Sequence, residues 1–274
     1  ASDVYKRQAP QKVRSLELPI RKASIPPILL LSLGQRFGTT ATPVVNIGQY
    51  VLKGQIIAES ADEIGTAVHA SSSGTVTDIR SHPVPSRYGT QALCIEIKTD
   101  GKDRWIDIPT VTDDVCNLPP SLVHKKMQES GIVGLGGAGF PSALKMLPDR
   151  NTDVQLLIVN AVECDPYISC DEALIREYAL QVVRGSQILR HAVQGHECVI
   201  AIRSDMSEGR AALARAIDSA GSPQVKIALL PAIYPAGGEK QLIKSLTGLE
   251  VPDQGLPLDL GIICYNVHTA LATY

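Results

Sequence analysis

The sequence lacks an excess of either charge and has no long apolar run. Its 26 lysine and arginine residues are balanced by 28 aspartate and glutamate residues, which leaves a formal charge of -2. A chain without an overall positive field has no electrostatic means of collecting nucleic acid or an anionic membrane surface. The apolar stretch from Ile25 to Leu33 is interrupted by Pro26, Pro27 and Ser32, and it is far shorter than the roughly 20 residues of a spanning helix. We therefore predict no nucleic-acid partner, and we expect any role at a membrane to be played from its surface.

The sequence also lacks a CxxC pair or any other four-cysteine framework. Its six cysteines are scattered at Cys94, Cys116, Cys164, Cys170, Cys198 and Cys264. Such spacing is typical of buried, reduced thiols, so no metal-binding residue is predicted. We find no secretory signal peptide and expect a cytoplasmic chain. Residues 1–8 are interpreted as a leader unrelated to the fold, and the apolar stretch before Tyr274 suggests a fragment of a longer protein.

Residues 9–112 are predicted to form a small β-rich domain. Between Pro43 and Trp105, short β-prone runs alternate with glycine turns, and no stretch keeps a helical period. Paired halves of this kind are typical of the barrel sandwich of biotinyl and lipoyl carriers. A carrier also needs an exposed lysine at its hairpin tip, and residues 59–65 contain none. We therefore predict the shape of a carrier domain without biotin or lipoate.

Residues 113–120 are predicted to be a linker, and residues 121–274 an α/β domain. The predicted strands cover residues 155–160, 197–203, 225–230 and 261–266. Helices are expected between them, at 121–130, after Pro141, from Ser169 to about Val193, at 208–219 and at 239–246. This alternation predicts a parallel sheet covered by helices on both faces.

Three of these predicted helices carry a specific signal at their start. Ser121 follows two prolines and is expected to cap the first helix, and Pro141 suits the first turn of the second. Ser169 and Glu172 have the spacing of a capping box, which predicts the start of the longest helix.

A glycine-rich loop precedes Pro141, with five glycines between positions 131 and 139. Glycine lets the backbone approach a ligand closely, and the free amides of a helix start favour an anion or an electron-rich ring edge. The loop departs from the dinucleotide fingerprint because a predicted helix precedes it. By itself it is equally well explained as a tight turn without a ligand.

Polar residues follow three of the predicted strands. The carboxyl ends of parallel strands meet at one edge of a sheet, where ligands of open α/β folds bind. The three clusters are Asn160, Glu163 and Asp165; Tyr234, Gly237, Gly238 and Glu239; and Asn266 with Thr269. Singly, each cluster is explained by loop solvation or helix capping, whereas together with the glycine loop they predict one ligand-binding crevice.

Several segments, in order, resemble the C subunit of the Rnf ion-translocating electron-transport complex. They are GLGGAGFPSALKM, NAVECDPYISCDEALIRE, YPAGGEKQLIKSLTGLEVP and LPLDLGIICYNVHTA. The glycine loop and the NVHT segment are also similar to those of the FMN-bearing, NADH-oxidising subunit of respiratory complex I. The likeness covers nearly all of Leu16 to Tyr274, and it implies a Rossmann-like FMN domain behind the barrel sandwich.

The resemblance also implies roles for individual residues, with the chemistry carried by the flavin rather than by a catalytic side chain. The implied FMN-binding residues are Gly134, Gly136, Gly137 and Gly139 beneath the ring, Lys145 beside it, Asn160, Glu163 and Asp165 at the ribityl chain or ring edge, and Asn266 and Thr269 at the phosphate. The implied NADH-binding residues are Phe140, Tyr234, Gly237, Gly238 and Glu239. Residues 203–207, Arg-Ser-Asp-Met-Ser, replace the family's acidic-Asn-Lys stretch, which puts a nucleotide contact on that loop in doubt.

For the whole protein, the resemblance implies a peripheral oxidoreductase component of a translocase on the cytoplasmic face of the cell inner membrane. It would pass electrons between NAD(H) and ferredoxin through FMN and [4Fe-4S] clusters, in contact with the other Rnf membrane subunits. The clusters would lie outside this chain, which contains no cysteine quartet. The alternative is a non-catalytic scaffold similar to the A subunit of the sodium-translocating NADH-quinone reductase. The intact GLGGAGFP loop favours a working pocket.

Overall fold

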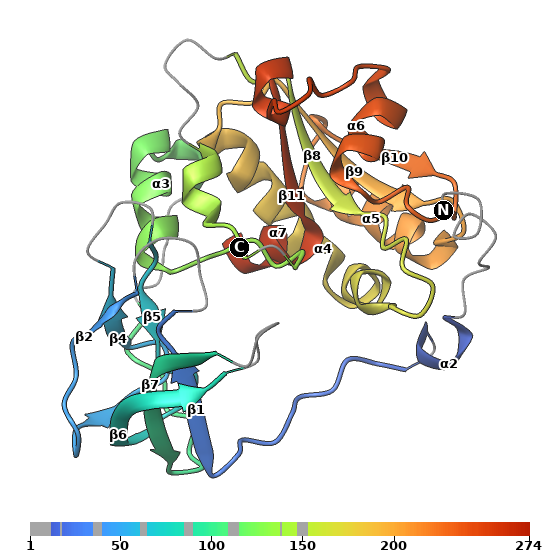
Figure 1. Cartoon of the computed structure of the whole chain (residues 1–274). Coiled ribbons are helices and arrows are strands. Elements are labelled where there is room, and N and C mark those ends of the chain that lie inside the picture. Colours follow the sequence, from blue (N-terminus) through green and yellow to red (C-terminus); the bar gives the residue numbers. More distant parts are fainter. Residues whose placement is uncertain are drawn as a thin grey trace.

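The computed structural model describes residues 12–16, 18–34, 40–60, 65–84, 90–108, 115–137, 139–146 and 153–274. The predicted leader, residues 1–8, lies outside the described residues. Figure 1 shows a β-rich region and an α/β region, with an extended segment that runs from β1 back to the short helix α2 (Val13–Leu16) beside the α/β region.

The β-rich region consists of two antiparallel sheets. One has the strand order β1-β7-β6-β3 and the other β2-β4-β5. The strands are β1 (Ile28–Ser32), β2 (Thr42–Pro43), β3 (Tyr50–Val51), β4 (Ile56–Glu59), β5 (Val68–His69), β6 (Gly74–Pro83) and β7 (Gln91–Thr99). Val51, Ile57, Val76, Ile95 and Ile97 are completely buried in one cluster between them. The predicted β-rich character is confirmed, although β1 follows two prolines and was not predicted as a strand.

The α/β region is built on a parallel sheet with the strand order β10-β9-β8-β11. Its strands are β8 (Leu156–Ala161), β9 (Glu197–Arg203), β10 (Val225–Leu230) and β11 (Ile262–Asn266). All four predicted strands are confirmed, and the bounds of β8 and β11 differ from the prediction by one residue. Both faces of β8 are buried, because its successive residues contribute to apolar clusters on opposite sides of the sheet.

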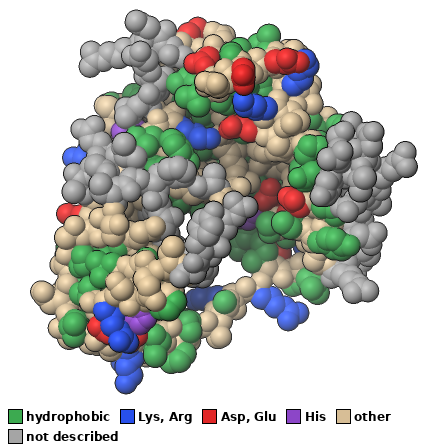
Figure 2. Space-filling view, in the orientation of Figure 1, with side chains coloured by type: hydrophobic (Ala, Val, Ile, Leu, Met, Phe, Trp, Pro, Cys, Tyr) green, Lys and Arg blue, Asp and Glu red, His purple; other side chains and the backbone are tan. Residues whose placement is uncertain are grey.

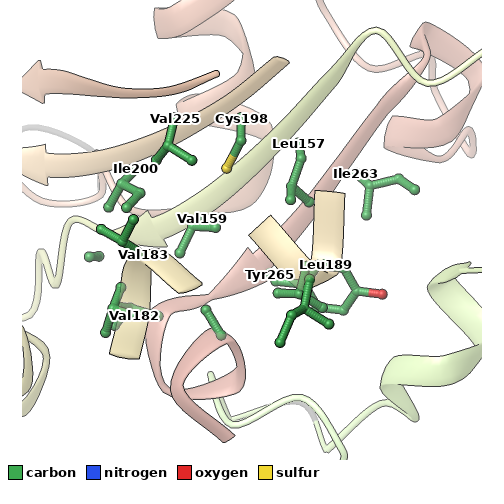
Figure 3. Close-up of a cluster of buried hydrophobic side chains, with 14 of the residues drawn as sticks. Leu157, Val159, Val182, Val183, Leu189, Cys198, Ile200, Val225, Ile263 and Tyr265 are labelled. Atoms are coloured by element: carbon green, nitrogen blue, oxygen red, sulfur yellow. The ribbon is translucent and has the colours of Figure 1, made fainter. Parts of the chain in front are cut away.

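Helices cover both faces of this sheet, as the alternation of elements predicted. The region contains η1 (Val115–Asn117), α3 (Pro120–Glu129), η2 (Ser142–Met146), α4 (Cys170–Ala192), α5 (Ser207–Ser219), α6 (Glu239–Thr247), η3 (Pro257–Leu260) and α7 (Val267–Thr273). In Figure 3, Val182, Val183 and Leu189 of α4 lie against Leu157 and Val159 of β8. On the opposite face, Leu242 and Ile243 of α6 pack on Ile158.

The predicted start of the longest helix at Ser169 is confirmed, whereas the start signals of three helices differ from the prediction in detail. The segment after Pro141 is a short 3-10 helix rather than an α-helix. Helix α3 begins at Pro120, and Pro119 rather than Ser121 occupies its N-cap position. Ser169 does precede α4, but its side chain makes no capping hydrogen bond. It donates instead to Ser15 Oγ at 2.6 Å, and Glu172 is engaged by Arg203.

The space-filling view shows both signs of charge interspersed on the face turned to the viewer, in keeping with the near-neutral composition (Figure 2). Among the helices of the described residues, none has both the length and the apolar character needed to cross a membrane.

Candidate functional site

The order of the parallel strands brings two distant parts of the chain together. Strand β8 pairs with β9 on one side and with β11 on the other. The strand order therefore changes direction between β8 and β11, because β9 and β10 follow β8 on one side and the chain then returns to its other side. Asn160 and Asn266 are register partners at the carboxyl ends of β8 and β11. Ligands of open α/β sheets bind outside the strand ends where the order reverses.

A cavity of about 260 Å³ lies at this edge. Four separate segments line it: the glycine loop with η2, the end of β8, the start of α6, and β11 with α7. The lining residues are Gly134, Gly136, Phe140, Ser142, Lys145, Asn160, Gly237, Glu239, Cys264, Tyr265, Asn266 and Thr269.

The two asparagines join the strand ends to their neighbouring loops. Asn160 donates from Nδ2 to the Gly237 carbonyl oxygen at 2.8 Å and accepts from the Val162 amide at 3.1 Å. Asn266 accepts from the His268 amide at 2.9 Å and thereby caps α7. The two side chains therefore fix the segments that follow β8 and β11 at the edge of the cavity.

The glycine loop closes on itself and is held against α7. The Gly134 amide donates to the Phe140 carbonyl oxygen at 2.7 Å, and the Leu135 amide donates to Thr269 Oγ1 at 3.0 Å. Gly137 has a φ of 101°, in the region that favours glycine. A Cβ atom added at Gly136 would lie 3.0 Å from Cβ of Asn266, so a side chain there would intrude on the cavity wall.

Lys145 crosses one side of the cavity. Its Nζ donates to the Cys264 carbonyl oxygen at 2.9 Å and lies 3.5 Å from Oε1 of Glu239. It also lies 5.6 Å from the centre of the Tyr265 ring, within the range of a cation–π contact. One cation and one carboxylate thus face each other beside an aromatic ring.

Three lining residues were missed by the sequence analysis: Ser142, Cys264 and Tyr265. Burial raises the pKa of the Tyr265 phenol, so its hydroxyl stays protonated and donates to the Ser142 carbonyl oxygen at 2.7 Å. Oγ of Ser142 is buried and has no hydrogen-bond partner among the described residues. Cys264 and Tyr265 were interpreted only as parts of a buried strand, and a carbonyl group on the free edge of that strand is not visible in a residue pattern.

The structure brings together nine of the predicted site residues and leaves six outside the lining. Gathered in the cavity are Gly134, Gly136, Phe140, Lys145, Asn160, Gly237, Glu239, Asn266 and Thr269. The residues outside its lining are Gly137, Gly139, Glu163, Asp165, Tyr234 and Gly238. Contacts between these six residues and a cofactor stay predictions.

Glu163 has partners of its own in the interior. Its Oε1 accepts from the Asp171 amide at 2.7 Å, and its Oε2 lies 3.4 Å from Nζ of Lys12 and 3.5 Å from Nη1 of Arg203. Burial raises the pKa of the Glu163 carboxyl, which the Asp171 amide and Lys12 oppose. The carboxylate is thus used to hold the loop after β8.

Arg203 begins the stretch that departs from the family pattern, and its side chain is only 2% exposed. It donates to Glu172 Oε2 at 2.8 Å, to Asp205 Oδ1 at 2.9 Å and to the Glu163 carbonyl oxygen at 3.1 Å. Its guanidinium group is thereby saturated by interior acceptors. A structural role for Arg203 follows from these contacts.

Two family models match the chain. Residues 7–102 match the RnfC barrel sandwich hybrid domain, and residues 127–274 match the Nuo51 FMN-binding domain. The predicted linker, residues 113–120, falls between the two matched ranges. A solved structure similar to this chain is that of an NAD+-reducing [NiFe]-hydrogenase in the H2-reduced state. It is 26% identical with a TM-score of 0.53, over 58% of this chain and 30% of that chain.

Curated relatives extend the likeness to both regions. The C subunit of the ion-translocating oxidoreductase complex of Pseudomonas aeruginosa is 43% identical over 96% of this chain and 34% of its own length. The corresponding protein of Pasteurella multocida is 36% identical over 96% of this chain and 31% of its own length. The chain spans about a third of the length of these relatives. It therefore belongs to the RnfC family, the C subunits of the ion-translocating oxidoreductase (Rnf) complex, with an RnfC barrel sandwich hybrid domain followed by a Nuo51 FMN-binding domain.

Proposed function

We propose that the cavity between β8, β11, the glycine loop and α6 is the FMN site of a Rossmann-like domain. The observation that supports it most directly is the convergence of four segments at the strand ends where the sheet order reverses. The match of residues 127–274 to the Nuo51 FMN-binding domain points to the same cofactor.

The residues present fit this group. The backbone of the glycine loop lies close to the Asn266 side chain, because a Cβ atom added at Gly136 would be 3.0 Å from Cβ of Asn266. The absence of a side chain at Gly136 therefore leaves room for a ligand. The buried hydroxyl of Ser142 needs a partner, and the amide groups of Asn160 and Asn266 suit hydroxyl and ring-edge groups. The volume of about 260 Å³ is slightly below the roughly 300–1,000 Å³ of complete ligand sites. That size suits a flat ring whose tail lies at the rim.

The protein's own side chains would bind and orient the cofactor. Lys145 would supply positive charge beside it, and Glu239 would hold Lys145 in place. Thr269 would keep the glycine loop on α7 through the Leu135 amide. When bound, FMN supplies the acceptance of a hydride and the release of single electrons.

For the whole protein, we propose electron input to an ion-translocating complex, from NAD(H) through FMN to ferredoxin or an equivalent carrier. Phe140, Gly237 and Glu239 would face the nucleotide at the entrance. The names of the relatives as complex subunits support contact with other Rnf membrane subunits, and we propose a peripheral position on the cytoplasmic face of the inner membrane. The [4Fe-4S] clusters stay a prediction for parts of the relatives that this chain does not span.

The proposal is tested by titrating the purified chain with FMN and following flavin fluorescence. We expect quenching that saturates at one FMN per chain. Gly136→Val should abolish saturable quenching because its side chain enters the cavity, whereas Gly34→Val is a matched control, since a Cβ atom there meets nothing closer than 3.7 Å. Thermal unfolding of both variants confirms that they are folded. Absence of quenching by the unmodified chain would contradict the proposal and favour the scaffold role.

A further inference from the structure

Three side chains with metal-binding atoms meet outside the cavity lining. Cys170 and Asp171 begin α4, and His268 lies in the first turn of α7. Nδ1 of His268 lies 2.9 Å from Oδ1 of Asp171, and Sγ of Cys170 lies 3.8 Å from the same oxygen. The possible ligand atoms of all three residues lie within 4.8 Å of one another.

We propose that Cys170, Asp171 and His268 bind a zinc ion that links the starts of α4 and α7. Thiolate, imidazole and carboxylate groups are the ligands that Zn²⁺ takes in proteins. At bond lengths of about 2.0–2.3 Å, two ligand atoms of a tetrahedral site lie about 3.3–3.5 Å apart. The observed separations of 2.9 and 3.8 Å bracket this value, so small side-chain rotations suffice.

Two of the three side chains are accessible from solvent, and the backbone that carries Asp171 is fixed by a hydrogen bond to Glu163. Cys170 is exposed and His268 is partly exposed, whereas Asp171 is buried. The Asp171 amide donates to Glu163 at 2.7 Å, which fixes the first turn of α4. The three protein ligands leave the fourth position to water.

Binding is an exchange of a proton for the metal ion without any redox step. Burial, together with the charges of Asp171 and Glu163, raises the pKa of the Cys170 thiol to about 12. The free thiol therefore carries its proton at neutral pH. Zinc binding forms the Zn–S bond and releases this proton to solvent.

The zinc ion would stabilise the part of α7 that borders the cavity. Asn266 and Thr269 flank His268 in sequence, and both line the cavity. A link from His268 to α4 would hold these two residues in place. Zinc binding requires no flavin, so its test does not depend on whether the cavity binds FMN.

The test uses the chain stripped of metal with a chelator and assayed without FMN. Titration with Zn²⁺ by calorimetry should give one ion per chain. Titration with Co²⁺ should give the near-ultraviolet absorption band of a thiolate-to-cobalt charge transfer, together with visible bands of tetrahedral cobalt. We expect Cys170→Ser to abolish the charge-transfer band. It should also weaken zinc binding by about tenfold or more, because the loss of a group that only hydrogen-bonds to a metal ligand already lowers metal affinity by about tenfold.

Two controls separate the site from ordinary surface binding. His196 lies 3.0 Å from Asp153 on the surface and forms a second histidine–aspartate pair. We expect His268→Asn to weaken zinc binding and His196→Asn to leave it unchanged, and Cys116→Ser should retain the cobalt band. The proposal is overturned if one-to-one binding is absent, if Cys170→Ser keeps the band, or if the two histidine variants behave alike.

Discussion

Lys12 donates a hydrogen bond from Nζ to the backbone carbonyl oxygen of Glu163 at 2.5 Å, across 151 residues of sequence. The same ammonium group donates to the Ile168 carbonyl oxygen at 2.5 Å. Nearby, Arg176 donates to the carbonyl oxygens of Leu16 and Leu18. The N-terminal segment is thereby attached to the loop that follows β8.

Replacing Lys12 should destabilise the chain. Burial lowers the pKa of Lys12, and Glu163 partly opposes this. Lys12→Met would leave the Glu163 carboxylate with less compensation in the interior. We expect a loss of about 3 kcal/mol, the lower end of the range for breaking a buried ion pair, because Arg203 remains. Urea unfolding measures it. Lys22→Met is the control, since the Lys22 side chain is 81% exposed; equal midpoints would show that Lys12 is not an anchor.

Helices α4 and α7 approach so closely at Gly185 that no side chain fits. A Cβ atom there would lie 1.8 Å from the Ala270 carbonyl oxygen. Gly185→Ala must separate the helices, and we expect a loss of about 2 kcal/mol with weaker FMN binding. A Cβ atom added at Gly209 in α5 would have the Ile175 side-chain methyl at 3.3 Å as its nearest atom and Met206 Cβ at 3.7 Å, with no backbone atom among its nearest neighbours. The higher helix propensity of alanine in Gly209→Ala should raise stability by up to about 1 kcal/mol. Similar unfolding curves for both variants would refute the argument.

The Thr269 hydroxyl connects the glycine loop to α7. Thr269→Val keeps the shape but leaves the Leu135 amide without its acceptor. We expect FMN affinity to fall by about tenfold, the equivalent of about 1.4 kcal/mol. Thr273→Val is matched to it, because Thr273 lies in the same helix and donates to the Thr269 carbonyl oxygen outside the cavity. Fluorescence titration of both variants measures the difference, and a reduction of equal size would assign the effect to α7 as a whole.

Asp100 gives the β-rich region a predictable response to acid. A hydrogen bond from the Tyr50 hydroxyl at 2.7 Å, followed by the Lys102 amide and Ser73, lowers the pKa of this carboxyl. The folded state therefore binds the proton less readily than the unfolded state. The resulting stabilisation is present above the ordinary value of 3.8 and is lost as the pH falls through the lower folded-state pKa.

Asp100→Asn should accordingly reduce stability at about pH 7, and the difference from the unmodified chain should shrink on acidification. Fluorescence of Trp105, the single tryptophan, reports unfolding of this region. Asp107→Asn, at an exposed position, is the control and should give no such trend. A difference that stays constant with pH would contradict the depressed pKa.

Local pattern predicted the strands of the parallel sheet well, because these strands are apolar runs buried on both faces. Strands β9 and β10 have the bounds that the sequence predicted. Each is a short apolar run flanked by polar residues or proline, and such a run defines both ends of a buried strand. The capping box at Ser169 and Glu172 was wrong, because Ser15 and Arg203 bind those side chains from far along the chain. A local signal cannot anticipate a distant competitor for the same atoms.

The candidate site was predictable in its location but not in its full membership. Asn160 and Asn266 follow strands, and the topology alone brings them together. Glu163 lies only three residues beyond Asn160, yet it is hydrogen-bonded by Lys12 and by the Asp171 amide and does not line the cavity. Ser142 lines the cavity from the start of η2, a 3-10 helix that stands in place of the predicted α-helix.

Among the four strands of the parallel sheet, β11 is the last in sequence, yet it pairs with β8, which is the first in sequence. During synthesis, β8 therefore keeps one hydrogen-bonding edge open until the ribosome has released residues 262–266. The Leu-Leu-Ile-Val run of β8 makes that open edge a template for aggregation. A polypeptide that stops before Ile262 is accordingly expected to aggregate as well as to lack the cavity, and productive folding of the nascent chain depends on protecting this edge.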